Sequence, residues 1–107
     1  MERLKIEKTE FTPEIILDHA NKNFSMKGNS RPEDVREIYF PVIEWMNKYR
    51  DFLKSEGKGY YTEDDPMVFE FDMEYFNSSS AKFLFDVVDV MRLMRKDGLA
   101  IEVAWIW

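Results

Sequence analysis

An asparagine followed by three serines is the stretch of this chain with the clearest chemical potential. The segment reads Asn77-Ser78-Ser79-Ser80 and separates an apolar strand-like run from a helical run. A turn from strand to helix presents free backbone N–H groups together with hydroxyls that a kinase can phosphorylate. Serine and asparagine are also preferred caps of helix N-termini. From the residues alone, both interpretations stay open: a simple helix cap and a phosphorylation site.

Other kinds of reactive site find little support in the sequence. There is no cysteine and only one histidine, His19, which we interpret as a surface residue in a hairpin turn. A serine hydrolase needs a base and an orienting group, and the Gly-x-Ser-x-Gly elbow is absent. The acidic run 63–65 lacks the spacing of a calcium loop, so we interpret it as solvated loop. We therefore expect no metal, no cofactor and no enzymatic activity.

The composition is that of one small acidic globular domain. The 107 residues carry a net charge of −6, and 45% of them are hydrophobic, enough for one core. An acidic surface argues against duplex nucleic acid or an anionic membrane as the main partner, since both attract basic surfaces. No apolar run approaches the roughly 20 residues of a membrane span, and no signal peptide is visible. We expect a cytoplasmic protein, and its charge is compatible with a basic protein partner.

The elements around the serine turn alternate between strand-like and helical patterns. Gly28–Pro32 predicts a break in the chain, after which Ser30 and Glu33 have the spacing of a capping box. The predicted elements are a strand near 3–7, a hairpin over about 14–27, a helix over about 33–53, a strand over 67–76, a helix over about 79–97 and a strand from 100 to Trp107.

This order predicts an α/β fold in a single domain over residues 1–107. The last strand–helix–strand unit is expected to be parallel with a right-handed crossover. Within the strand 67–76, alternation places Phe69, Phe71 and Met73 on a core face and the acidic residues on a partly solvated face. We therefore expect a mixed sheet of four to five strands with two main amphipathic helices.

Four blocks of the sequence resemble the SiaC family of bacterial regulatory phosphoproteins. The blocks occur in the family's order and cover most of the chain, and the last one is the most specific. They are Thr9-Glu10-Phe11-Thr12-Pro13-Glu14, Gly28-Asn29-Ser30-Arg31-Pro32-Glu33, Pro41-Val42-Ile43-Glu44-Trp45 and Tyr75-Phe76-Asn77-Ser78-Ser79-Ser80-Ala81-Lys82.

The resemblance implies a STAS-like fold, akin to anti-sigma-factor antagonists, and a non-enzymatic role as the switch of a partner-switching system. It implies that a kinase with a histidine-kinase-type ATPase fold adds a phosphate and that a PP2C-type phosphatase removes it. The unphosphorylated form would bind an output protein such as a diguanylate cyclase. The alternative is a constitutive interaction or accessory domain without a phosphate switch.

The resemblance also assigns the phosphate to Ser78, the hydroxyl residue directly after the asparagine, where many relatives have threonine. Relatives continue past the position of Trp107, so a C-terminal segment of the family is expected to be absent. The residues expected to shape the turn or to contact a partner are Asn77, Ser79, Ser80, Lys82 and Tyr75.

Overall fold

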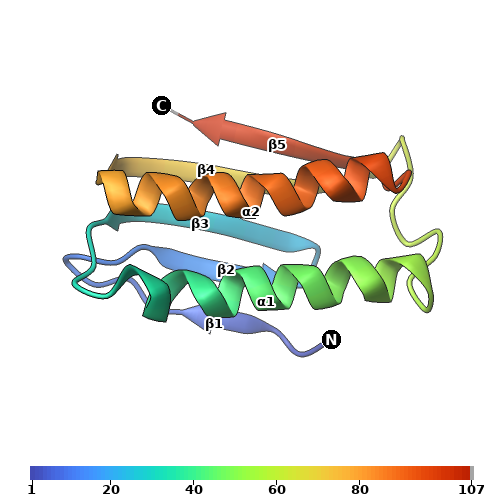
Figure 1. The fold of residues 1–107 in the computed structure, drawn as a ribbon. Coiled ribbons are helices and arrows are strands. Elements are labelled where there is room, and N and C mark those ends of the chain that lie inside the picture. Colours follow the sequence, from blue (N-terminus) through green and yellow to red (C-terminus); the bar gives the residue numbers. More distant parts are fainter. Residues whose placement is uncertain (107) are drawn as a thin grey trace.

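The computed structural model describes residues 1–106 and shows two layers, a five-stranded sheet and two helices that cover one of its faces (Figure 1). The elements are β1 (Leu4–Ile6), β2 (Glu14–Asp18), β3 (Asn23–Ser30), α1 (Val35–Lys54), β4 (Met67–Phe76), α2 (Ser78–Lys96) and β5 (Ile101–Ile106). The strands lie in the order β1-β2-β3-β4-β5. The first three are antiparallel, and β3, β4 and β5 are parallel. The predicted α/β class with a mixed sheet is confirmed.

Each helix connects two neighbouring parallel strands, α1 from β3 to β4 and α2 from β4 to β5. Both connections lead to the next strand in the same direction across the sheet. Crossovers between parallel strands are almost always right-handed, so both helices lie on the same face of the sheet. In Figure 1 the two helices run side by side in the same direction. Their N-terminal ends therefore meet at one edge of the molecule, beside the carboxyl ends of β3 and β4.

The core lies between the helices and the sheet. As predicted, Phe69 and Phe71 of β4 are fully buried, whereas Glu70 and Asp72 on the opposite face are partly exposed. The alternation follows from the two-residue period of a strand. The other hydrophobic core side chains with no exposed surface are Ile15, Leu17, Met26, Tyr39, Val42, Met46, Tyr49, Val87 and Met94.

Most predicted element boundaries are confirmed to within three residues. The hairpin begins at residue 14 as predicted, β4 spans the predicted residues, and α2 begins and ends one residue earlier than predicted. The parallel pairing of β4 and β5 is also confirmed. The predicted extension of the last strand to Trp107 lies outside the described residues.

The predicted break at Gly28–Pro32 begins too early, because the chain leaves regular structure only at Arg31, and the predicted helix cap at Ser30 is wrong. The strand β3 continues to Ser30 because β4 keeps pairing with it, through a shift of register after Gly28. Gly28 has a φ of 116°, which a residue without a Cβ adopts readily at such an irregularity. The cap of α1 is Asp34, whose side chain accepts a hydrogen bond from the N–H of Arg36.

His19 was predicted to be a surface residue, but it is half-buried beneath the loop that connects α1 to β4. Its Nδ1 lies 2.7 Å from the hydroxyl of Tyr49, which lies 2.7 Å from the hydroxyl of Tyr61. Tyr60 donates a hydrogen bond of 2.8 Å to the carbonyl of His19. Burial raises the pKa values of Tyr49 and Tyr61, so both stay protonated. These contacts hold the loop against the β2–β3 turn.

We predict that the free energy of unfolding falls between about pH 7.5 and about pH 5.5 because of His19. Burial lowers the pKa of His19 below its usual 6.5 in the folded protein. As the pH falls, the unfolded chain therefore binds the proton first, and this uptake favours unfolding. Urea denaturation at the two pH values measures the loss. In His19→Asn, whose amide can still form a hydrogen bond with Tyr49, the free energy of unfolding should be the same at both pH values. An equal loss in that variant contradicts the assignment to His19.

Candidate functional site

An asparagine cap fixes the turn between β4 and α2. The Oδ1 of Asn77, the residue before the helix, accepts a hydrogen bond of 2.9 Å from the N–H of Ser80. The carbonyl of Asn77 accepts from the N–H of Ala81 at 2.9 Å. Its own N–H donates to the carbonyl of Ser30, at the end of β3, at 3.0 Å. The start of α2 is therefore tied to the neighbouring strand.

Three buried hydroxyls hold the same turn against β3 and α1. The Oγ of Ser80 donates to the carbonyl of Ser30 at 3.0 Å and accepts from the Oγ of Ser30 at 2.8 Å. The hydroxyl of Tyr39 lies 2.6 Å from the Oγ of Ser30, and burial raises the pKa of Tyr39. All three residues have no exposed surface. Since Ser80 is enclosed and its hydroxyl is fully used, it is not accessible to a kinase.

The hydroxyls of Ser78 and Ser79, unlike that of Ser80, face solvent. Both residues are exposed, and within residues 1–106 neither side chain makes a hydrogen bond. Their backbone N–H groups belong to the first turn of α2, where a helix offers no internal acceptor. This turn contains no acidic residue, so no carboxylate within it neutralises the positive helix end. Both hydroxyls are open to solvent, and the geometry alone does not distinguish between them.

The two other residues predicted to lie at the site, Tyr75 and Lys82, stand before and after the turn in the chain. The ring of Tyr75 is 52% exposed, and the guanidinium of Arg31 lies 6.0 Å from its centroid. Arg31 also lies 5.4 Å from the ring of Phe11, which is 50% exposed. Lys82 is exposed and pairs with Asp86 at 3.5 Å. Arg31 and Phe11 were not predicted as site residues, because their positions depend on tertiary contacts. The pairing of β3 with β4 brings Arg31 to Tyr75, and the N–H of Arg31 donates to the carbonyl of Phe11 at 2.9 Å.

Residues 1–106 show neither a cluster of metal ligands nor a helix of membrane-spanning character. Within the described part of the chain, no group of three or more histidine, aspartate or glutamate side chains is arranged to hold a metal ion. The acidic run 63–65 is exposed loop, as predicted. None of the helices in residues 1–106 combines the length and the apolar character of a membrane span.

The fold and the turn together define a small two-layer α/β protein that presents serine hydroxyls at the start of a helix. The chain belongs to the SiaC family of regulatory phosphoproteins, since the family model matches residues 6–107. The family resemblance of the four sequence blocks is thus confirmed. Proteins of this family are regulators rather than enzymes.

One curated relative and two solved structures that are similar to this chain come from Pseudomonas aeruginosa. An uncharacterized protein of strain UCBPP-PA14 is 28% identical over 105 residues, which cover 98% of this chain and 75% of that protein. The crystal structure of apo-SiaC matches with a TM-score of 0.83 at 27% identity, over 100% of this chain and 80% of that one. A crystal structure of the diguanylate cyclase SiaD in complex with its activator SiaC matches with a TM-score of 0.80 at 27% identity. That match covers 97% of this chain and 77% of the matched chain.

The two neighbouring serines Ser79 and Ser80 offer a matched test of the buried hydroxyl network. We predict that Ser80→Ala lowers the free energy of unfolding by about 1–3 kcal/mol, because the Oγ of Ser30 loses its acceptor inside the protein. Ser79→Ala should change it by less than about 0.5 kcal/mol, since that side chain is exposed. Chemical denaturation of the two variants measures both values. Equal effects would show that the network does not stabilise the turn.

Proposed function

We propose that this protein is the phosphorylated switch of a bacterial partner-switching system and that Ser78 accepts the phosphate. One observation carries the proposal: a member of a regulatory phosphoprotein family presents an exposed, unbonded hydroxyl directly after a capping asparagine. Ser80, the third serine of the run, is enclosed. Ser79 is exposed as well, so the choice of Ser78 rests on the position that the family's phosphoacceptor takes after the asparagine.

A phosphate on Ser78 would be compatible with the folded state. It adds a charge of about −1.5 to −2 at the first residue of α2, where free N–H groups and the helix dipole favour an anion. The hydrogen bonds that hold the turn use Asn77, Ser80 and Ser30, so modification of Ser78 breaks none of them. A partner docked over the turn would meet a new charge at its interface. The phosphate would therefore act on binding and leave the fold in place.

The proposed system has three partners. A kinase with a histidine-kinase-type ATPase fold adds the phosphate, a PP2C-type phosphatase removes it, and the unphosphorylated form binds an output protein. The complex of the similar protein SiaC with the diguanylate cyclase SiaD supports a diguanylate cyclase as that output protein. We place these reactions in the cytoplasm, where the kinase finds ATP.

We predict that the cognate kinase and ATP add one phosphate to the wild-type protein and none to Ser78→Ala. The control is Ser79→Ala, which removes the neighbouring exposed hydroxyl and should be phosphorylated like the wild type. Mass spectrometry of the intact proteins and of their peptides measures the modification and locates it. Phosphate that persists in Ser78→Ala would sink the assignment to Ser78. A protein that takes up no phosphate at all would favour a constitutive interaction domain.

We also predict that Ser78→Asp weakens binding to the output cyclase by about tenfold, whereas Ser78→Ala binds like the wild type. Aspartate places a negative charge at the turn, although a smaller one than phosphate. Lys58→Ala is the charge control, because it makes the protein more negative by the same amount at an exposed loop residue. Isothermal titration calorimetry measures the affinities. Equal affinities for Ser78→Asp and Ser78→Ala would count against an electrostatic mechanism.

A further inference from the structure

Arg31 is an exposed arginine whose charge is held only by two aromatic rings. Its guanidinium lies 5.4 Å from the ring centroid of Phe11 and 6.0 Å from that of Tyr75, and both rings are about half exposed. Within residues 1–106, the side chain of Arg31 donates no hydrogen bond and forms no ion pair with a carboxylate. Cation–π contacts at exposed rings are weak, and they leave the N–H donors of the guanidinium available to a ligand.

The backbone of Arg31 lies beside the serine turn. The carbonyl of Ser30, the residue before Arg31, accepts a hydrogen bond of 3.0 Å from the N–H of Asn77. Asn77 in turn directly precedes Ser78. Figure 1 shows the start of α2 and the connection from β3 to α1 at the same end of the molecule. Because the side chain of Arg31 is long and exposed, rotation about its bonds can bring the guanidinium to the side chain of Ser78.

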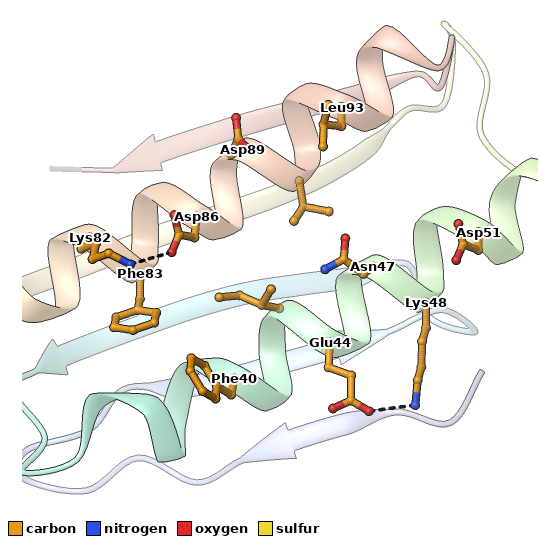
Figure 2. A pocket seen from close by; sticks show the side chains of 12 residues that line it. Phe40, Glu44, Asn47, Lys48, Asp51, Lys82, Phe83, Asp86, Asp89 and Leu93 are labelled. Carbon is orange, nitrogen blue, oxygen red and sulfur yellow. Dashed lines mark hydrogen bonds and ion pairs between the residues drawn. The ribbon is translucent and has the colours of Figure 1, made fainter.

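Two other charged side chains near the turn already have partners. Lys82, four residues after Ser78, pairs with Asp86 at 3.5 Å, as Figure 2 shows. Asp34, three residues after Arg31, caps α1 and forms an ion pair with that helix at 3.9 Å. Arg31 is therefore a cation without a carboxylate partner in residues 1–106, beside a helix turn that contains no acidic residue.

We propose that Arg31 receives the phosphate on Ser78, so that its guanidinium leaves the two rings and forms an ion pair with the phosphate in the same chain. The guanidinium fork matches two phosphate oxygens with parallel N–H···O bonds, whereas an ammonium group acts only as a point charge. A pair with a group that carries a charge of about −1.5 to −2 is stronger than a cation–π contact at an exposed ring. This inference rests on the proposed function, since it identifies what the phosphate on Ser78 binds within the protein.

Transfer of the guanidinium would change a second surface beside the turn. In the unphosphorylated protein, the charge of Arg31 lies against the rings of Phe11 and Tyr75. Phe11 precedes β2 and Tyr75 lies near the end of β4, so the two rings belong to separate elements. After the transfer, both rings would lose their cation, and the charge would lie at the start of α2. A partner that contacts these rings would therefore distinguish the two states by the position of one guanidinium as well as by the phosphate.

The test uses the full chain with Ser78 translated as phosphoserine by a suppressor tRNA, so that no kinase is needed. A pH titration followed by phosphorus NMR measures the second pKa of the phosphate, which is about 6 without a partner. A cation in contact favours the dianion and lowers this pKa. We expect the pKa of the phosphate to be at least about 0.5 lower in the presence of Arg31 than in Arg31→Gln. Equal pKa values in the two proteins would overturn the proposal.

Lys82→Gln and Arg36→Gln are the matched controls, because each removes one exposed positive charge near the start of a helix. Lys82 is also the competing receptor, since a cation four residues after an anion on a helix can pair with it. Each control should change the pKa of the phosphate by less than half as much as Arg31→Gln does. A control with an effect as large as that of Arg31→Gln would refute the specific role of Arg31.

The side chain of Arg31 provides an independent readout. In the unphosphorylated protein, the ring currents of Phe11 and Tyr75 should shift its proton resonances upfield, and Tyr75→Leu should reduce this shift. With phosphoserine at position 78, the upfield shift should disappear and the Nε proton should move downfield as it binds the phosphate. An upfield shift that persists in the phosphorylated protein would contradict the proposal, because the guanidinium would still lie on the rings.

The failure of this inference and that of the proposed function can be told apart, because the phosphoserine is introduced without the kinase. If the kinase modifies Ser78 and the pKa of the phosphate does not depend on Arg31, only the present inference is refuted. If the introduced phosphate pairs with Arg31 while the kinase leaves Ser78 unmodified, only the proposed switch is refuted.

Discussion

The buried chain of hydroxyls from Tyr39 through Ser30 to Ser80 is the interaction on which the geometry of this surface depends. It joins the first half of α1, the last residue of β3 and the first turn of α2. An unpaired hydroxyl in this position costs about 1–3 kcal/mol, so the three elements keep one arrangement relative to one another. This network therefore fixes the position of the turn that carries the two exposed serines.

The three consecutive serines have different positions because of helix geometry. Successive residues of a helix point about 100° apart, so a run of three cannot share one environment. Ser80 points into the protein and Ser78 and Ser79 point out. The cap itself is Asn77, and this leaves the exposed hydroxyls without a structural task. A stable helix start and a modifiable hydroxyl are therefore compatible in one short turn.

The topology of the sheet decides where the two helices begin. Two parallel crossovers in the same direction bring the N-terminal ends of both helices to the edge where β3 and β4 end. An anion at the start of α2 interacts favourably with the dipole of that helix.

The sequence by itself determined the elements whose pattern is local and strong, together with the family. Alternation placed β4, a 3.6-residue period placed α2, and the asparagine before the serines marked the start of that helix. Ser30 shows the limit of local signals, because a capping-box spacing was overridden by the pairing of β3 with β4. His19 is similar, since its burial depends on tyrosines from a distant loop. Only the tertiary structure decided which serine is enclosed and which aromatic rings contact Arg31. Both depend on segments that are far apart in the chain.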